Sequence, residues 1–217
     1  MNIERRTLAI DEVESSVPLL AIESRSEDGG DREWIVGYAA KFGVNSLDLG
    51  DFVERIDPGA FDIVAERRGR KKPLETRALW NHDANYPLAR YPGTLKLNVD
   101  EVGLRYEFPV PDTSYGRDLA ANIRAGIVRG SSFSFTVPSG GDAWTTENGR
   151  SLRVISRIDS LLDVSPTTFP AYPDTDVKVA QRSFNAFRSQ RDADSSRLLA
   201  VQARAADLRE YLRRHGR

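Results

Sequence analysis

The stretch Gly130-Ser131-Ser132-Phe133-Ser134-Phe135 alternates hydroxyl-bearing and aromatic side chains along most of its length. Successive side chains of an extended strand point to opposite faces, so Ser132 and Ser134 lie on one face and the phenylalanines on the other. We expect the phenylalanines to face the core and the two serines to face a cleft. The run therefore predicts a strand over 131–137.

Further short strands are predicted on both sides of this one. Leu95, Leu97 and Val99 alternate with polar residues, as in a half-buried strand. Short strands with only occasional helices favour a mostly β fold with flanking helices (α+β), a closed or nearly closed β-barrel, over a parallel βαβ sheet. The predicted strands cover 17–22, 33–40, 52–56, 76–80, 94–99, 104–110, 131–137 and 151–162, and the predicted helices cover 57–67 and 114–125.

The composition excludes several classes of protein. The 217 residues suffice for one domain with tails, and no apolar run reaches the length of a membrane span. The polar N-terminus does not resemble a secretory signal, which predicts an intracellular protein. The absence of cysteine excludes disulfides, thiolate zinc sites and a cysteine nucleophile, and two distant histidines exclude a histidine-rich metal site.

Charge is distributed unevenly over a chain whose net charge is −1. Residues 1–32 hold eight acidic against four basic residues, and 183–217 hold eight arginines against four acidic residues. Such tails suggest electrostatic docking to a partner or to each other, and solvated flexible ends explain them equally well. We therefore divide the chain into an acidic segment with a first strand (1–30), a β-barrel domain (31–180) and an arginine-rich helix or tail (181–217).

Two further segments have predicted roles. Ser195 or Ser196 can cap a helix whose apolar residues recur at steps of three and four, a spacing typical of a docking or self-associating helix. The basic run 67–73 has no aromatic residues between its charges, so it predicts an exposed loop rather than a nucleic-acid site.

One histidine, one serine cluster and one carboxylate point to hydrolysis. A serine hydroxyl becomes a nucleophile when a base takes its proton, and His82 is the only histidine before residue 215. Ser132 lies nearer to Gly130, where backbone can approach a substrate closely, so we prefer it to Ser134. Asp163 follows apolar residues and is the candidate carboxylate that orients the imidazole.

Each of these residues also has an ordinary structural reading. His82 fits a histidine at the end of a strand, the serines fit a solvent-facing strand, and Asp163 fits the cap of a turn. Asp83 competes with Asp163, but adjacent side chains on a strand point to opposite faces.

At these residues the chain resembles the prohead maturation proteases of tailed phages, which are related to herpesvirus assemblins. The resemblance extends over roughly 33–180. The family's catalytic histidine falls on His82, its nucleophilic serine on Ser132 and its acidic residue, usually Glu, on Asp163. Ser134 replaces a glycine of the family pattern. The matching elements are Gly37-Tyr38-Ala39-Ala40-Lys41-Phe42 with Phe52–Phe61, Leu79–Asp83 with Pro87-Leu88-Ala89, Gly103-Leu104 with Asp112-Thr113, Gly130–Phe135, and Leu161–Tyr172.

The resemblance implies a β-barrel of the herpesvirus-protease type and a serine endopeptidase inside the assembling prohead, in the host cytoplasm. Its substrate would be the scaffold, or the scaffolding segment of the major capsid protein, and commonly itself. No metal, cofactor, membrane or specific nucleic acid is implied, and a homo-oligomer is compatible with it. Backbone N–H groups would stabilise the oxyanion, with basic side chains near Arg153 or Arg157 as further candidates.

Two other functions compete with this one. A degenerate relative could bind capsid subunits through its charged tails, with His82 and Ser132 inherited but inactive. An intracellular esterase would show a G-x-S-x-G elbow on a strand–turn–helix unit, and the sequence has none.

Overall fold

The computed structural model describes residues 3–8, 18–27, 30–46, 48–65, 74–169 and 178–215. The predicted basic loop 67–73 lies outside these residues. The chain divides into two units, residues 1–179 and 180–217, and the strands of the described residues all belong to the first.

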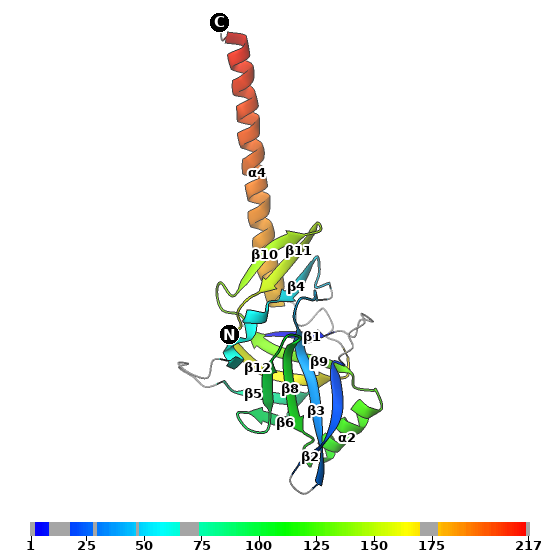
Figure 1. Cartoon of the computed structure of the whole chain (residues 1–217). Coiled ribbons are helices and arrows are strands. Elements are labelled where there is room, and N and C mark those ends of the chain that lie inside the picture. Colours follow the sequence, from blue (N-terminus) through cyan, green and yellow to red (C-terminus); the bar gives the residue numbers. More distant parts are fainter. Residues whose placement is uncertain are drawn as a thin grey trace. The chain divides into compact units, whose positions relative to one another are not determined.

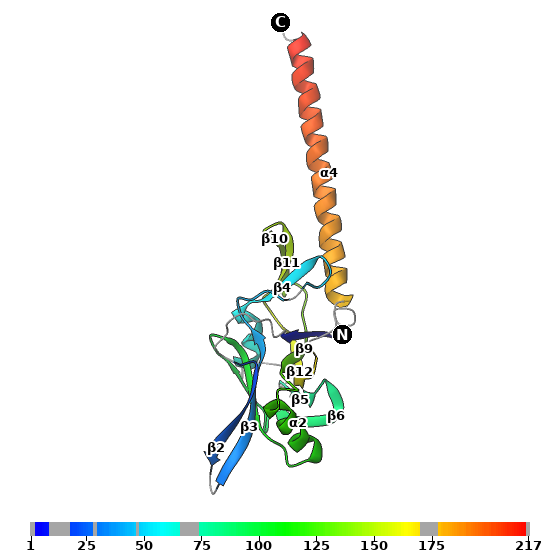
Figure 2. The same ribbon diagram turned by 90° about the vertical axis from the view of Figure 1, so that its right-hand side faces the viewer.

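The described strands form three sheets (Figures 1 and 2). Five strands hydrogen-bond in the order β1-β9-β12-β5-β6, four in the order β2-β3-β8-β7, and three in the order β10-β11-β4. The first sheet contains β1 (Glu4–Leu8), β9 (Gly130–Thr136), β12 (Ser160–Thr167), β5 (Thr76–Trp80) and β6 (Asp83–Tyr91); the second contains β2 (Leu20–Glu27), β3 (Gly30–Lys41), β8 (Gly103–Pro109) and β7 (Lys96–Val99); the third contains β10 (Asp142–Glu147), β11 (Arg150–Ile155) and β4 (Phe52–Ile56).

The prediction of a mostly β fold with a few helices is confirmed, but the predicted barrel is wrong. A barrel requires that every strand pair with two neighbours. Among the described strands, each of the three sheets ends in two edge strands, so none of them closes. Short, evenly spaced strands are as typical of stacked sheets as of barrels, and the spacing therefore could not separate the two architectures.

The five-stranded and four-stranded sheets share one hydrophobic core. Phe133 and Phe135 of β9 stack with ring centroids 4.7 Å apart and belong to the same buried cluster as Tyr106 and Phe108 of β8. The Tyr106 hydroxyl lies 3.0 Å from the Ser131 hydroxyl of β9. The prediction that the phenylalanines face the core is confirmed.

The first predicted helix begins where expected. The Asp57 carboxylate accepts the backbone N–H of Gly59 at 2.9 Å and so caps the 3-10 helix η1 (Pro58–Phe61), which continues into α1 (Asp62–Ala65). The expected end near residue 67 lies outside the described residues.

The second predicted helix, α2 (Ser114–Arg124), is also confirmed. The Thr113 hydroxyl accepts the backbone N–H of Gly116 at 3.1 Å and caps its start. Gly126, at φ 69°, follows its end in the left-handed conformation that glycine adopts without strain.

Several strand predictions need correction. The run 151–162, predicted as one strand, belongs to β11 and β12, which lie in different sheets. Between them the Ile158 and Asp159 backbone N–H groups bond the carbonyls of Ala60 and Thr136, so the chain changes partners there. β1, β6 and β10 were not predicted.

The described residues of the second unit all belong to the helix α4 (Lys178–His215). The predicted helix start at Ser195 or Ser196 is wrong, because the helix is continuous there and the Ser196 hydroxyl donates to the Asp192 carbonyl at 2.9 Å. Leu198 and Val201 are exposed. Within the described residues, no helix is both long and apolar enough for a membrane span.

A charged cluster covers one face of the four-stranded sheet. The Glu107 carboxylate accepts two bonds from the Arg25 guanidinium, at 3.0 and 2.9 Å, and one from Arg105 at 2.6 Å. The hydrogen bonds from Arg25, with those from Arg105, outweigh burial and lower the pKa of Glu107 to about 2.

This shift predicts a pH-dependent contribution to stability. Because the folded pKa lies below the ordinary value of 4.5, the contribution is complete above that value and is lost as the pH falls through about 2. After allowance for solvent screening, Glu107→Gln should lower the free energy of unfolding by about 1–2 kcal/mol at pH 7. Urea denaturation should show this difference shrinking toward acid pH. The exposed control Glu101→Gln should change stability by less than about 0.5 kcal/mol at any pH.

Candidate active site

Ser132 lies near the centre of β9, between β1 on one side and β12 on the other. Every residue of β9 is buried, and Ser132 itself has no exposed surface. The predicted open cleft beside Ser132 and Ser134 is therefore wrong for this conformation. Their face of the strand is covered by other parts of the chain.

His82 lies in a two-residue turn between β5 and β6. Trp80 and Asp83 pair across the hairpin, and Asn81 and His82 between them have φ values of 55° and 59°. Positive φ at both central residues is the signature of a type I′ turn, which joins twisted antiparallel strands without splaying them. This conformation costs a non-glycine residue about 1–2 kcal/mol, and such strain is typical of functional sites.

Asn81 attaches the turn to the end of β12. Its backbone N–H bonds the Pro166 carbonyl at 3.0 Å, its side-chain oxygen accepts the Thr168 N–H at 2.9 Å, and its side-chain nitrogen lies 3.2 Å from the Thr168 hydroxyl. These contacts hold the imidazole against the sheet. The sequence holds a signal for this turn, because asparagine tolerates the left-handed region well.

Asp163 lies on β12, the strand next to β9, and its Cα partner there is Ser134. A register shift between Leu161 and Asp163 marks a bulge just before it. From Asp163 onward, alternate residues of β12 share a face with Ser132.

The three predicted residues meet at one point. The His82 Nδ1 lies 2.5 Å from the Asp163 Oδ1, and the His82 Nε2 lies 2.7 Å from the Ser132 Oγ. Both ring nitrogens are therefore occupied, one by the carboxylate and the other by the hydroxyl. A base set between an acid and a hydroxyl in this way can take a proton from the hydroxyl and keep its tautomer while it does so.

Asp163 is ionised in this setting. Burial alone raises the pKa of its carboxyl, but the hydrogen bond and charge of His82, with hydrogen bonds from Ser134 and Ser165, outweigh burial and lower it. The Ser165 hydroxyl donates to the Asp163 Oδ1 at 2.7 Å. The carboxylate is thus fixed from two sides.

The family model of the caudovirus prohead serine proteases matches residues 20–190. This match covers most of the 217 residues. The chain belongs to this family. The family predicted from the sequence motifs is confirmed, and with it the class of serine protease.

One solved structure, the bacteriophage T4 capsid assembly protease gp21, is also similar to this protease. The two share 16% sequence identity, and the match covers 77% of this chain and 99% of that chain with a TM-score of 0.37. No curated protein matches.

Ser134, which replaces a glycine of the family pattern, lies behind the imidazole. Its hydroxyl is 3.3 Å from the His82 Nδ1 and accepts the Arg5 Nε–H at 3.2 Å. The added hydroxyl therefore approaches the histidine–aspartate pair.

The basic side chains suggested as oxyanion donors have other partners here. The Arg153 guanidinium bonds three carboxylates, and an Arg157 nitrogen bonds the Ser139 carbonyl at 3.2 Å. None of these hydrogen bonds involves Ser132.

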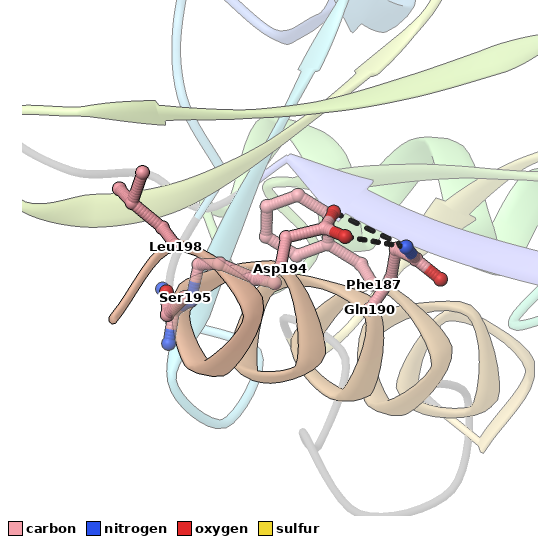
Figure 3. A pocket seen from close by; sticks show the side chains of 6 residues that line it. Phe187, Gln190, Asp194, Ser195 and Leu198 are labelled. Carbon is pink, nitrogen blue, oxygen red and sulfur yellow. Dashed lines mark hydrogen bonds between the residues drawn. The ribbon is translucent and has the colours of Figure 1, made fainter. Parts of the chain in front are cut away.

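No other part of the described chain offers a competing site. Within it, no cluster of three or more His, Cys, Asp or Glu residues could hold a metal ion. A surface hollow on α4 is lined by residues of that one helix and holds none of the three site residues (Figure 3). Its lining residues are Phe187, Gln190, Arg191, Asp194, Ser195 and Leu198.

The role of Asn81 can be tested through stability. Asn81→Ala should lower the free energy of unfolding by about 2 kcal/mol, because it removes the side-chain bonds to Thr168 and adds strain at positive φ. Asn81→Gly keeps the backbone freedom and should lose about half as much. Urea denaturation of both variants measures the difference, and equal losses would show that the turn is not strained.

Proposed function

We propose that this chain is a serine endopeptidase that cleaves scaffold, or the scaffolding segment of the major capsid protein, and its own chain during prohead maturation. The observation that carries the proposal is the position of the His82 imidazole, between the Ser132 hydroxyl and the Asp163 carboxylate. Family membership supports the class of reaction and the place, the prohead in the host cell. Neither a metal nor a cofactor has a step in the mechanism.

His82 acts first as a general base. The Ser132 Oγ attacks the scissile carbonyl carbon while its proton passes to the His82 Nε2, and a tetrahedral oxyanion forms. Asp163 accepts the Nδ1–H bond and stabilises the imidazolium. The oxyanion then collapses, the C–N bond breaks, and the leaving nitrogen takes the proton from Nε2. Water attacks the acyl ester in the same way and restores the serine.

The rival function is a non-catalytic capsid-assembly protein that keeps the residues of the site. The complete burial of Ser132 favours it, because a buried hydroxyl cannot meet a substrate. A fluorophosphonate probe separates the two functions. Covalent labelling of Ser132, located by mass spectrometry, supports the protease. Absence of labelling both in the wild type and in the Arg6→Gln variant described below supports the binding protein.

The serine and the histidine should act as a unit. Ser132→Ala or His82→Ala alone should lower kcat by about 10⁴-fold or more, and the double variant should lose little beyond that. The measurement is the cleavage rate of the phage's major capsid protein. Ser131→Ala on the opposite face of β9 is the matched control, and multiplying losses in the double variant would contradict the mechanism.

Asp163→Asn should keep the fold and lower kcat by about 10³–10⁴-fold, because an amide can hold the imidazole in the wrong tautomer. Asp159→Asn, in the turn before the same strand, provides a control for the charge change. A loss below about tenfold would remove Asp163 from the mechanism. Mass spectrometry of the wild type beside Ser132→Ala would also show which bonds of its own chain the protease cuts.

A further inference from the structure

The N-terminal strand lies against the candidate nucleophile. β1 forms one edge of the five-stranded sheet and pairs antiparallel with β9, in a register that sets Thr7 opposite Ser132. The Ser132 hydroxyl bonds the backbone carbonyl of Arg6 at 2.9 Å. That carbonyl belongs to the peptide bond between Arg6 and Thr7.

This is the arrangement of an extended peptide added to the edge of a sheet. In that binding mode, backbone pairing gives affinity and pockets for alternate side chains give specificity. Glu4 and Arg6 are the alternate residues whose side chains are buried, whereas Arg5 between them is exposed. The strand therefore presents two side chains to the body of the protease and one peptide bond to Ser132.

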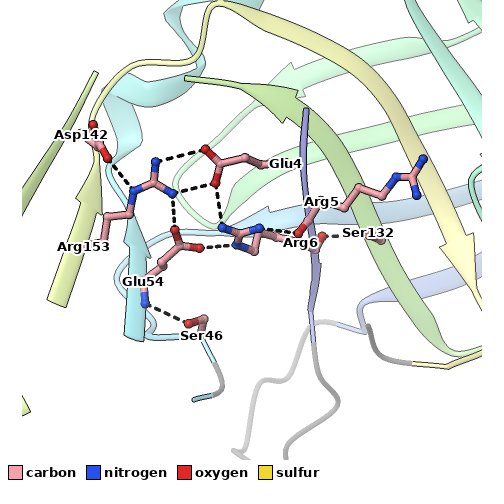
Figure 4. Close-up of polar contacts among 8 residues, drawn as sticks. All are labelled: Glu4, Arg5, Arg6, Ser46, Glu54, Ser132, Asp142 and Arg153. Atoms are coloured by element: carbon pink, nitrogen blue, oxygen red, sulfur yellow. Dashed lines mark hydrogen bonds and ion pairs between the residues drawn. The ribbon is translucent and has the colours of Figure 1, made fainter. Parts of the chain in front are cut away.

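The buried Glu4 and Arg6 side chains contact two residues of opposite charge on other strands (Figure 4). The Arg6 Nε–H donates to the Glu54 carboxylate, and the Arg6 guanidinium also bonds Glu4 at 2.8 Å. The Glu4 carboxylate in turn accepts bonds from the Arg153 guanidinium at 2.7 and 3.1 Å. Glu54 thus receives the arginine of the strand, and Arg153 receives its glutamate.

Glu54 and Arg153 hold this geometry through contacts outside β1. They are Cα partners in the parallel pairing of β4 with β11, and their side chains bond at 2.6 Å. Arg153 also bonds Asp142 of β10 at 2.6 Å. Burial alone raises the pKa of Glu54, but Arg6 and Arg153 outweigh burial and lower it, so the carboxylate is charged. If β1 leaves, the charged Glu54 carboxylate remains beside the position that the Arg6 guanidinium occupied.

We propose that β1 occupies the substrate-binding edge of the protease, and that Glu54 selects substrates with arginine at the residue whose carbonyl meets Ser132. Arg153 adds a preference for glutamate two residues earlier. The inference rests on the proposed function. In this conformation the chain's own strand fills the site and keeps external substrates out.

The hydroxyl of Ser132 explains why the strand inhibits. It has one proton and two acceptors within reach, the His82 Nε2 and the Arg6 carbonyl oxygen. A hydroxyl that donates to the carbonyl oxygen does not pass its proton to the imidazole and does not direct its lone pair at the carbonyl carbon. A substrate strand in the same place reacts when the proton lies toward Nε2, with the bonds made and broken as described above.

The test for inhibition uses the full chain. Arg6→Gln should weaken the attachment of β1 to the sheet and speed fluorophosphonate labelling of Ser132 by about tenfold. Arg117→Gln, which removes the same charge from the exposed surface of α2, should change the labelling rate by no more than about twofold. Equal effects of the two variants would overturn the proposed role of β1.

The test for specificity uses two end-blocked peptides, the sequence 3–8 and the same peptide with R6Q. The wild type should cleave the arginine peptide after that arginine, with kcat/KM about 100-fold higher than for the glutamine peptide. Glu54→Gln should reduce this ratio to about fivefold or less, and Glu54→Asp should recover part of it. Glu147→Gln, which removes the exposed partner of Arg55, is the control and should leave the ratio unchanged.

The outcomes separate this inference from the proposed function. Cleavage without preference for arginine, or with a preference that Glu54→Gln leaves intact, overturns the inference but still supports the proposed protease function. Failure of every variant, Arg6→Gln included, to label Ser132 or cleave either peptide overturns both. Circular dichroism melting of each variant identifies any loss of activity that comes from unfolding.

Discussion

The pairing of β12 with β9 is the interaction on which the site depends. It sets Asp163 and Ser165 opposite Ser134 and Ser132, on the face of the sheet where the imidazole lies. β5 pairs with the far side of β12, so its hairpin turn brings His82 over the same strand. Three residues that are 50 and 31 positions apart in sequence meet because their strands are neighbours in one sheet. A slip of one residue in the β9–β12 register would turn either the hydroxyl or the carboxylate to the opposite face.

Much of this could be predicted from the sequence, for physical reasons that also explain what was missed. The alternation around Ser132 was readable because one face carries phenylalanines that pack in the core. The imidazole could be proposed because the chain has only two histidines, and the family motifs that the sequence resembles pointed to Ser132 and Asp163. The strand β1 was missed because Glu4 and Arg6 are charged, and a charged run predicts solvent. Their burial is satisfied by partners on strands far away in sequence, β4 and β11, which no local pattern reveals.

The barrel was wrong for a related reason. Local alternation reports which face of a strand is buried, but closure depends on which strands pair, and pairing is a property of the whole chain. The run 151–162 is an example: its two halves have similar composition, yet they join different sheets. The change occurs at Ile158 and Asp159, whose backbone N–H groups bond Ala60 of η1 and Thr136 at the end of β9. The chain passes there from β11, which holds Arg153, to β12, which holds Asp163.

A site that is blocked by its own strand must release it, and the charges of β1 suit that requirement. Buried ion pairs gain little net free energy, because the cost of removing both charges from water offsets most of their attraction. Glu4 and Arg6 together carry no net charge, so their departure leaves the charge of the site unchanged. Glu54 and Arg153 remain paired to each other after β1 leaves, which limits the penalty of an empty site. Such pairs specify which strand fits the edge more than they strengthen its binding, and a competing strand with the same two charges can therefore replace it.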